Sequence, residues 1–247
     1  MNGSRIGTKI ERFGKVDSTN DIAKSLARDG AREGTVIIAD SQSGGRGRYE
    51  RCWSSPSGGI FVSVILRPDT LSGRVSLLPL LAGSAVANTL NGLYGIGAQV
   101  KWPNDVLIGE RKVSGILSEI DTDDDFVIVG IGINANFDPG DLPKEVRKTA
   151  TTLKAELKRE VSKTELLRRL LSELDDMYNR FCTGSLKISC STIKKQVKVI
   201  TKTQEFLGKA EEIDETGALI LRLGDGSTQR IISGECIHLS EGIDSTF

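Results

Sequence analysis

Hydrophobic residues in the first part of the chain recur with two different spacings. After the polar stretch 17–20, which is typical of a helix N-cap, they follow a helical period. Short β-branched runs at 35–39 and 60–66 instead predict buried strands. Residues 77–93 predict a core helix with Pro79 in its first turn. Further strands are predicted at 100–102, 106–108, 112–120 and 126–133, with turns at 109–110 and 121–125.

The pattern changes twice in the second part. Beyond Pro143 it becomes helical, and Ser162 and Glu165 have the spacing of a capping box. One apolar stripe, read as core, then comprises Leu166, Leu167, Leu170, Leu171, Leu174, Met177, Tyr178 and Phe181. After Ser185, turn residues separate five short predicted strands at 196–201, 206–213, 218–223, 229–232 and 236–239. We predict an α+β fold of two domains: 1–188, a mixed or antiparallel sheet with packed helices, and 189–247, a small β-barrel.

Composition narrows the possible functions. The 33 basic and 33 acidic residues balance, which argues against a dedicated nucleic-acid or membrane-surface binder. The uncharged stretch 75–100 contains too many Ser, Asn and Gly residues for a membrane span. Four cysteines without a C-x-x-C spacing indicate reduced thiols in a cytoplasm. The single histidine, His238, excludes a Ser-His-Asp or multi-histidine site, so Lys, Arg, carboxylates and backbone amides must perform any chemistry.

A segment rich in glycine and arginine, residues 44–53, lies between two predicted strands. Its glycines let backbone amides approach an anion, and Arg46, Arg48 and Arg51 supply the bidentate donors that phosphate prefers. Trp53 offers an aromatic face for a base. Taken alone, the segment fits a phosphate-binding loop and an exposed flexible or RNA-binding loop equally well.

Two lysines flank a predicted hairpin. Lys101 opens the sequence KWPND at 101–105, and the hairpin would bring it to the same side as Lys112. Both tryptophans of the chain, Trp53 and Trp102, lie in these charged segments, a placement that a purely structural role does not require. Taken singly, Lys112 fits a surface lysine beside a turn better than a functional residue, and Asp105 fits a helix or turn cap better.

A third segment has glycines within an apolar strand, at Gly130 and Gly132 of 130–136. Glycine weakens a strand and often marks the close approach of a ligand or another backbone. The segment is not a dinucleotide fingerprint, and the chain has no Walker A pattern.

Together these segments resemble the biotin protein ligase family, in order and in spacing, over nearly the whole chain. The motifs that carry the resemblance are STN at 18–20, Gln42, GRGR at 45–48, Arg51, WSSP at 53–56, KWPND at 101–105, Lys112, GIL at 115–117 and GIGIN at 130–134. The resemblance implies a catalytic domain like that of class II aminoacyl-tRNA synthetases, followed by a β-rich C-terminal module.

Enzymes of this family use ATP to adenylate the biotin carboxylate and then transfer biotin to a lysine of a carrier domain. The resemblance implies that the catalytic cations are Lys112, Arg48 and Lys101. The carboxylate and the phosphates are both anions, so cations must offset their repulsion. Mg²⁺ is expected on the ATP phosphates, with no protein ligand identified. The residues implied for ATP or the adenylate are Arg46, Arg48, Arg51, Trp53, Asn104, Lys112 and Asn134.

Biotin itself has a polar ureido head and an apolar ring and chain. The residues implied for it are Ser18, Thr19, Asn20, Gln42, Gly45, Arg46, Lys112, Gly115, Leu117, Gly132 and Ile133. Small residues would let the backbone lie flat against the ligand. The loop 44–53 should be mobile when empty and close over the adenylate when phosphate binds.

Some features depart from the family or limit the prediction. Glu50 stands where many relatives have glycine, and Cys52 is read as a packing residue, with a reactive thiol as the alternative. Seventeen residues precede Ser18, too few for a DNA-binding domain, so we expect a monofunctional ligase that binds neither DNA nor membrane. The expected partners are the biotin carboxyl carrier domain of an acyl-CoA carboxylase and a second copy in a homodimer.

Three other functions remain open at this point. Lipoate or octanoate ligases and transferases share the catalytic fold but lack the paired GRGR and KWPND segments in this form. A non-catalytic biotin or nucleotide sensor would keep the ureido pocket but need not keep both Arg48 and Lys112. An RNA-binding protein could use the arginine loop and residues 187–202, although the neutral charge and the lack of interleaved aromatics argue against it.

Overall fold

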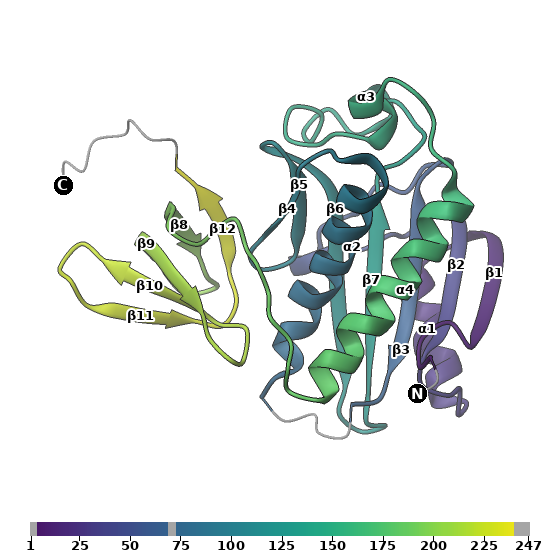
Figure 1. The fold of residues 1–247 in the computed structure, drawn as a ribbon, viewed down its shortest axis with the longest axis horizontal. Helices are drawn as coiled ribbons and strands as arrows, with labels where there is room; N and C mark the ends of the chain where they lie inside the picture. Colours follow the sequence, from purple (N-terminus) through teal and green to yellow (C-terminus); the bar gives the residue numbers. More distant parts are fainter. Residues whose placement is uncertain (1–3, 69–72, 240–247) are drawn as a thin grey trace.

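A computed structural model describes residues 4–68 and 73–239. Its larger part is a seven-stranded sheet in the order β1-β2-β3-β7-β6-β5-β4 (Figure 1). β1 pairs with β2 in parallel and the remaining neighbours are antiparallel. The strands are β1 (Lys9–Val16), β2 (Thr35–Gln42), β3 (Ile60–Leu66), β4 (Ala98–Lys101), β5 (Asp105–Ile108), β6 (Arg111–Asp121) and β7 (Phe126–Ile133).

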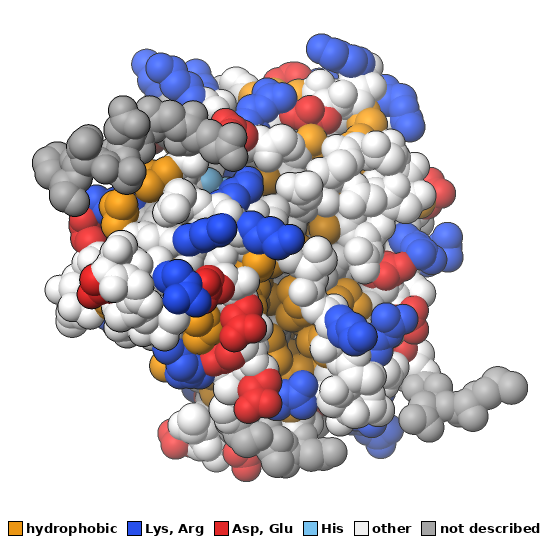
Figure 2. All heavy atoms as spheres, turned by 60° about the vertical axis from the view of Figure 1, so that its left-hand side comes forward, with side chains coloured by type: hydrophobic (Ala, Val, Ile, Leu, Met, Phe, Trp, Pro, Cys, Tyr) orange, Lys and Arg blue, Asp and Glu red, His pale blue; other side chains and the backbone are white. Residues whose placement is uncertain are grey.

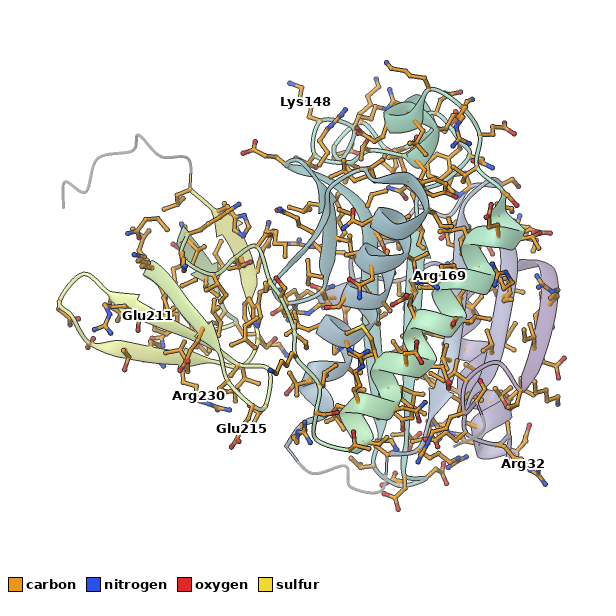
Figure 3. All side chains as sticks on the ribbon, viewed as in Figure 1. Arg32, Lys148, Arg169, Glu211, Glu215 and Arg230 are labelled. Carbon is orange, nitrogen blue, oxygen red and sulfur yellow. The ribbon has the colours of Figure 1, made fainter. Side chains whose placement is uncertain are left out.

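Helices cover both faces of this sheet, because the central strands are apolar on both sides. On one face, α2 (Leu78–Tyr94) and α4 (Lys163–Cys182) pack over residues such as Val62 and Val129. On the other, α1 (Thr19–Arg28) packs over Ile65 and Ile128. Charged side chains such as Lys148, Arg169 and Arg32 point outward from these layers (Figure 3). The short helices are α3 (Leu153–Leu157) and the single turns Arg48–Glu50, Val75–Leu77 and Pro139–Asp141.

The α1 face is only partly covered, and this leaves room for a site. α1 packs on the half of the sheet formed by β2, β3 and β7. Toward the other half, Gly132 of β7 pairs with Gly115 of β6, and Gly130 pairs with Leu117. Because side chains alternate along a strand, the glycines that face this side leave a bare strip of backbone beside the start of α1.

The C-terminal part forms a second sheet of five antiparallel strands in the order β11-β10-β9-β8-β12. The pairings leave β11 and β12 at the edges, so the predicted barrel takes the form of an antiparallel sheet in the described residues. Its apolar core is continuous with that of the large sheet. The strands are β8 (Gln196–Ile200), β9 (Glu205–Ile213), β10 (Leu219–Leu223), β11 (Thr228–Ile231) and β12 (Glu235–His238).

Trp102 joins the two parts. It is 1% exposed, its Nε1 donates to the carbonyl of Gly217 at 3.0 Å, and its backbone N–H donates to Thr192 Oγ1 at 3.0 Å. Thr192 in turn contacts His238 Nε2 at 3.0 Å. Trp102 therefore has a structural role, because the Gly217 turn of the small sheet covers its ring. It also lines the cavity described below.

Most of the predicted elements are confirmed. β3 and β7 have the predicted bounds, and Ser162 caps α4 by accepting from the N–H of Glu165 at 3.3 Å. The sequence analysis missed β1, an edge strand with mostly polar, exposed positions. No helix in the described residues is long and apolar enough to cross a membrane, and no disulfide joins any of the four cysteines. The expected cytoplasmic location stays a prediction.

Candidate active site

A cavity of about 520 Å³ lies over the glycine strip, between α1, the loop 46–54 and the small sheet. Figure 2 shows hydrophobic side chains in a hollow that charged side chains border. Every predicted site residue except Gly45 and Ile133 lines this cavity. The predicted residues that line it are Ser18, Thr19, Asn20, Gln42, Arg46, Arg48, Arg51, Trp53, Lys101, Asn104, Lys112, Gly115, Leu117, Gly132 and Asn134.

The end of the cavity nearest α1, here called the amide end, is a group of buried neutral donors and acceptors. The backbone N–H of Thr19 donates to Gln42 Oε1 at 2.8 Å, and Gln42 Nε2 donates to Ser55 Oγ at 2.8 Å. Ser63 lies behind them, with its Oγ 2.7 Å from Thr19 Oγ1 and 2.6 Å from Asn20 Oδ1. These contacts fix side chains that α1, β2 and β3 bring together.

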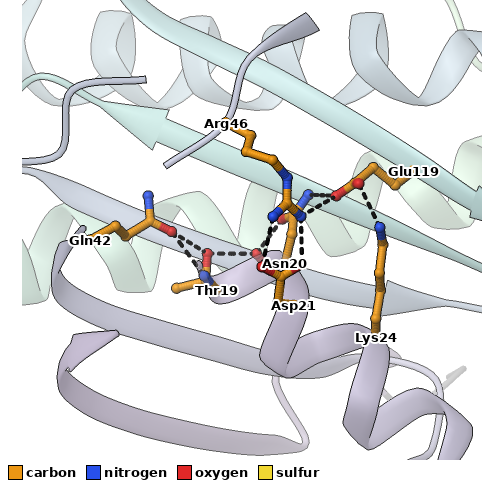
Figure 4. A network of polar contacts seen from close by, with 8 residues as sticks. Thr19, Asn20, Asp21, Lys24, Gln42, Arg46 and Glu119 are labelled. Carbon is orange, nitrogen blue, oxygen red and sulfur yellow. Dashed lines mark hydrogen bonds and ion pairs between the residues drawn. The ribbon is translucent and has the colours of Figure 1, made fainter. Parts of the chain in front are cut away.

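Arg46 does not point into the cavity with the other loop arginines. Its guanidinium makes a bidentate pair with Asp21 of α1, both distances being 2.6 Å, and lies 3.5 Å from Glu119 (Figure 4). The Asp21 hydrogen bond raises the pKa of Arg46, and the same bond lowers the pKa of Asp21. The structure thus assigns this side chain an anchoring contact between the loop and α1, whereas its predicted contact with phosphate stays a prediction.

Trp53 lies flat on the glycine strip. A Cβ at Gly132 would stand 2.3 Å from Trp53 Nε1, and one at Gly115 would stand 2.9 Å from its Cζ3, so only glycine allows this contact. The indole N–H is buried without a hydrogen-bond partner. A ligand placed on this floor would lie against Trp53. Its predicted contact with adenine stays a prediction.

Lys112 reaches the cavity from β6. Its Nζ lies 2.6 Å from Asp105 Oδ1 and 5.2 Å from the centre of the Trp53 ring. Asn104 holds the adjoining turn, because its Nδ2 donates to the carbonyl of Ile116 at 2.8 Å. The predicted hairpin has therefore brought Lys101 and Lys112 to one cavity, and Asp105 is the counter-ion of Lys112 rather than a cap.

The opposite end, here called the arginine end, is built by both sheets. Arg48 Nη2 donates to Ser233 Oγ at 2.6 Å and Arg48 Nη1 to the carbonyl of Gly234 at 3.1 Å. Burial lowers the pKa of Arg48, although the guanidinium remains charged at neutral pH. Arg51 pairs with the carboxylate of Glu235, and this hydrogen bond lowers the pKa of Glu235.

The loop backbone is strained at this end. Tyr49 has φ 56° and Glu50 has φ 58°, in the left-handed region that favours glycine. Each such residue costs about 1 kcal/mol or more. The departure from the family at Glu50 therefore falls where glycine would relieve strain, and the contacts of Arg48 and Arg51 hold the strained turn in place.

Two predicted residues lie outside the cavity lining. Ile133 is fully buried in the core on the α2 side, because it alternates with Gly132 along β7. Gly45 lies under the loop, where a Cβ would stand 2.4 Å from the carbonyl oxygen of Trp53. Both belong to motifs that the resemblance links to biotin, but a motif does not show in which direction each of its side chains points.

The sequence analysis also missed part of the lining. Residues 142–150, which follow β7, and residues 234–237 of the small sheet border the cavity. No local signal could have found Glu235, since it reaches Arg51 only through the docking of the two sheets.

A model of the biotin/lipoate A/B protein ligase family matches residues 13–136, and one of the biotin protein ligase C terminal domain matches residues 192–239. The chain belongs to the biotin/lipoate A/B protein ligase family, as the sequence motifs predicted.

Individual relatives cover most of the chain. It is 35% identical over 240 residues to the bifunctional ligase/repressor BirA of Bacillus subtilis, covering 90% of this chain and 74% of the relative. It is 31% identical over 244 residues to the biotin–[acetyl-CoA-carboxylase] ligase of Mycobacterium tuberculosis, covering 94% and 89%. A structure of biotin protein ligase from Aquifex aeolicus in complex with biotin and ATP matches with a TM-score of 0.80 and 31% identity, covering 93% and 98%.

Proposed function

We propose that this protein is an ATP-dependent biotin protein ligase. One observation carries the proposal: a single cavity joins a neutral, hydrogen-bonding amide end to a cationic end with Lys112, Arg48 and Arg51. Biotin has the matching polarity, with a neutral ureido head and a carboxylate separated by an apolar chain. Family membership and the relatives that bind biotin and ATP support the same assignment.

In the proposed complex, the ureido head contacts Thr19 and Gln42. The ring system packs against Trp53, whose indole lies on Gly115 and Gly132. The carboxylate then points to Lys112, which leaves Asp105 to bind it. The glycines suit this arrangement, because no Cβ holds the indole, and with it the ligand, away from the sheet.

In the first step, a carboxylate oxygen of biotin attacks the α-phosphorus of ATP. A new O–P bond forms, the bond to the β-phosphate oxygen breaks, and pyrophosphate leaves with the electron pair. Negative charge accumulates on the phosphoryl oxygens, and Lys112, Arg48 and Arg51 are the cations placed to stabilise it. Lys101 lines the same end and is proposed to assist.

Mg²⁺ would bind together with the triphosphate of ATP. The described residues contain no group of three His, Cys, Asp or Glu side chains arranged to hold a metal. Asp105, Glu110 and Glu235 are the carboxylates that line the cavity and could contact the hydrated ion. The ion would supply charge neutralisation at the phosphates.

In the second step, a neutral lysine amine of the acceptor attacks the acyl carbon. An amide forms, the bond from the acyl carbon to the phosphate oxygen breaks, AMP leaves with the electron pair, and the nitrogen releases a proton to solvent. We propose a biotin carboxyl carrier domain as the acceptor and a homodimer as the assembly. β4 is the edge strand of the large sheet and ends at Lys101 beside the cavity, but its outer side is already hydrogen-bonded, by Asn91 at Ala98 and by Ser191 at Val100. Support for the carrier domain comes instead from the relatives named biotin–[acetyl-CoA-carboxylase] ligase.

The test is ATP-dependent pyrophosphate release with biotin or with lipoate. We expect release with biotin that falls strongly in Arg48→Ala and in Lys112→Ala. Arg111→Ala is the matched control, because Arg111 precedes Lys112 on β6 but pairs with Glu156 at 2.7 Å. Release with lipoate alone would move the protein to the lipoate ligases, and biotin binding without release would make it a sensor.

A further inference from the structure

The loop 44–53 folds back on itself, and this leaves the main chain of Arg46 free. Arg46 lies opposite Cys52 in an isolated antiparallel bridge. Two hydrogen bonds, at 2.9 Å and 2.6 Å, join the residues on either side of this pair: Trp53 with Gly45, and Gly47 with Arg51. In such a pair, the N–H and C=O of the middle residue point away from the opposite arm. Within the described residues, nothing accepts a hydrogen bond from the backbone N–H of Arg46.

Arg46 lines the cavity, but its guanidinium lies outside the lining. The guanidinium contacts Asp21 and Glu119, and neither of these carboxylates lines the cavity. The main chain and the stem of Arg46 therefore form this part of the wall. The preceding residue, Gly45, lies against the amide end, since a Cβ there would stand 3.1 Å from Gln42 Nε2. The free N–H of Arg46 is thus a backbone donor beside the amide end.

The orientation of this peptide depends on the Arg46 side chain. Gly45 and Gly47 flank Arg46, and glycine restricts the main chain little. The side chain is held firmly instead, because Arg46 Nη1 and Nη2 donate to different oxygens of Asp21, each at 2.6 Å (Figure 4). A bidentate pair of this kind fixes direction as well as distance.

Asp21 is itself attached to a firm part of the molecule. It lies in the first turn of α1, whose buried alanines pack on the large sheet. Glu119 of β6 contacts the same helix through Lys24 Nζ at 2.5 Å and lies 3.5 Å from Arg46 Nη2. Loop, helix and sheet therefore meet at one point beside the amide end.

We propose that Asp21 is a positioning residue, whose pair with Arg46 holds the backbone N–H of Arg46 as a fixed donor to the oxygen of a ureido group. A peptide N–H can only donate. The oxygen is the one strong acceptor of a ureido group, because both of its nitrogens carry hydrogens. The inference rests on the proposed function, in which the ligand is biotin. Asp21 contacts no substrate and acts through Arg46.

Asp21→Asn tests the proposal, because it keeps the size of the side chain but removes its charge and one of the two acceptors. We expect the Kd of biotin, measured by calorimetry, to rise about fivefold, which corresponds to the upper range for a half-exposed ion pair. The KM of ATP should stay within about twofold of wild type, because the cationic groups at the arginine end are unchanged.

A change in the ligand separates this role from a general loosening of the loop. In thiobiotin, a sulfur atom replaces the ureido oxygen and accepts hydrogen bonds only weakly. Asp21→Asn should therefore change the Kd of thiobiotin by less than about twofold. Desthiobiotin keeps the ureido oxygen and lacks the ring sulfur, so its Kd should rise about fivefold, as for biotin.

A double-mutant cycle tests whether Asp21 acts through Arg46. Arg46→Met removes the guanidinium but keeps an unbranched stem and the backbone N–H. In this background, Asp21→Asn should change the Kd of biotin by less than about twofold. Asp121→Asn is the matched control and should leave the Kd unchanged, because Asp121 also pairs with an arginine, Arg28 of α1 at 2.7 Å, that is not part of the loop.

Four results would overturn the proposal: a wild-type Kd of biotin in Asp21→Asn, an equal loss for thiobiotin, the same loss in the Arg46→Met background, or an equal loss in Asp121→Asn. Failure of the proposed function looks different, since the wild-type protein would then bind no biotin in the same calorimeter.

Discussion

The two ends of the cavity recognise their ligands by different physical means. At the amide end, Thr19, Asn20 and Ser63 are at most 5% exposed, and Ser63 contacts both of the others at hydrogen-bond distance. At the arginine end, the side chains of Arg51 and Glu235 are 62% and 39% exposed, and they form an ion pair that a stronger anion can replace. The first end belongs to one sheet, whereas the second is assembled from both.

This difference explains why the two ends should respond differently to mutation. Buried hydrogen bonds are costly to leave unmade, so the amide end should discriminate sharply between similar ligands. Exposed ion pairs contribute little and are screened by salt, so the arginine end should exchange partners readily during a reaction cycle. Lys112 lies between these cases, because its ion pair with Asp105 is half-buried.

The largest effect is expected from Lys112→Ala. The substitution removes a preorganised cation and leaves the Asp105 carboxylate facing the phosphates, so the rate of biotin adenylation should fall by about 10²–10³. Single-turnover formation of the adenylate measures it. A rate within threefold of that of Arg111→Ala would show that the cationic end does not depend on Lys112.

Gly132→Ala should come next. Its Cβ would stand 2.3 Å from Trp53 Nε1, so the indole must leave the floor. Overpacking of this kind costs about 1–3 kcal/mol, and we expect the KM of biotin to rise about tenfold while the KM of ATP changes less. Gly140→Ala is the control, since nothing lies within 4 Å of a Cβ there. An equal effect on both substrates would contradict a separate floor for biotin.

A smaller effect is expected on the pH dependence of stability, through His238 of the small sheet that contributes to the arginine end. Burial, with the nearby Lys195 and Lys101, lowers the pKa of His238 to about 4. Because this lies below the unfolded value of about 6.5, the neutral ring stabilises the fold above pH 6.5, and that contribution is lost as the pH falls through about 4.

His238→Gln should therefore flatten the acid dependence of stability. Between pH 7 and pH 4.5, the free energy of unfolding in urea should fall more in wild type than in the variant, by on the order of 1–2 kcal/mol. This figure is discounted because His238 is only half-buried. Gln can still accept from Thr192, so packing is conserved. Parallel pH profiles for the two proteins would exclude this role for His238.

The smallest effect is expected from Glu235→Gln. Its pair with Arg51 is exposed, so the free energy of unfolding should change by less than about 1 kcal/mol. Without the competing carboxylate, the KM of ATP should fall about two- to threefold, and less so in high salt. Glu211→Gln, which breaks a pair with Arg222 elsewhere on the small sheet (Figure 3), should leave the KM unchanged. A raised KM would mean that Glu235 aligns Arg51 instead of competing for it.

Sequence reasoning reached the segments of the site but not the direction of every side chain. Strand periodicity located Gly132 and Gly115, and the hairpin correctly united Lys101 with Lys112. The GRGR loop has no periodicity, so nothing in it distinguished Arg46, which anchors to α1, from Arg48 and Arg51, which reach the small sheet.

Long-range docking accounts for the remaining errors. The charged neighbours of Trp102 in sequence do not show that the turn at Gly217 buries its side chain. The sequence analysis missed edge strand β1 because most of its positions are exposed. Its sequence therefore lacks the alternation of apolar and polar residues that marks a half-buried strand. Such contacts arise between segments far apart in sequence, and local propensity does not encode them.

The contact of Arg48 and Arg51 with residues 233–235 also bears on how the protein matures during synthesis. A ribosome makes the large sheet and its glycine floor first, and residues 233–235 only near the end of the described chain. While they are still in the exit tunnel, the strained turn at Tyr49 and Glu50 has no contact from the small sheet to hold it. A nascent chain would thus possess a floor for its ligand before it possesses a finished reaction centre, and activity would begin only after the last strand, β12, has paired.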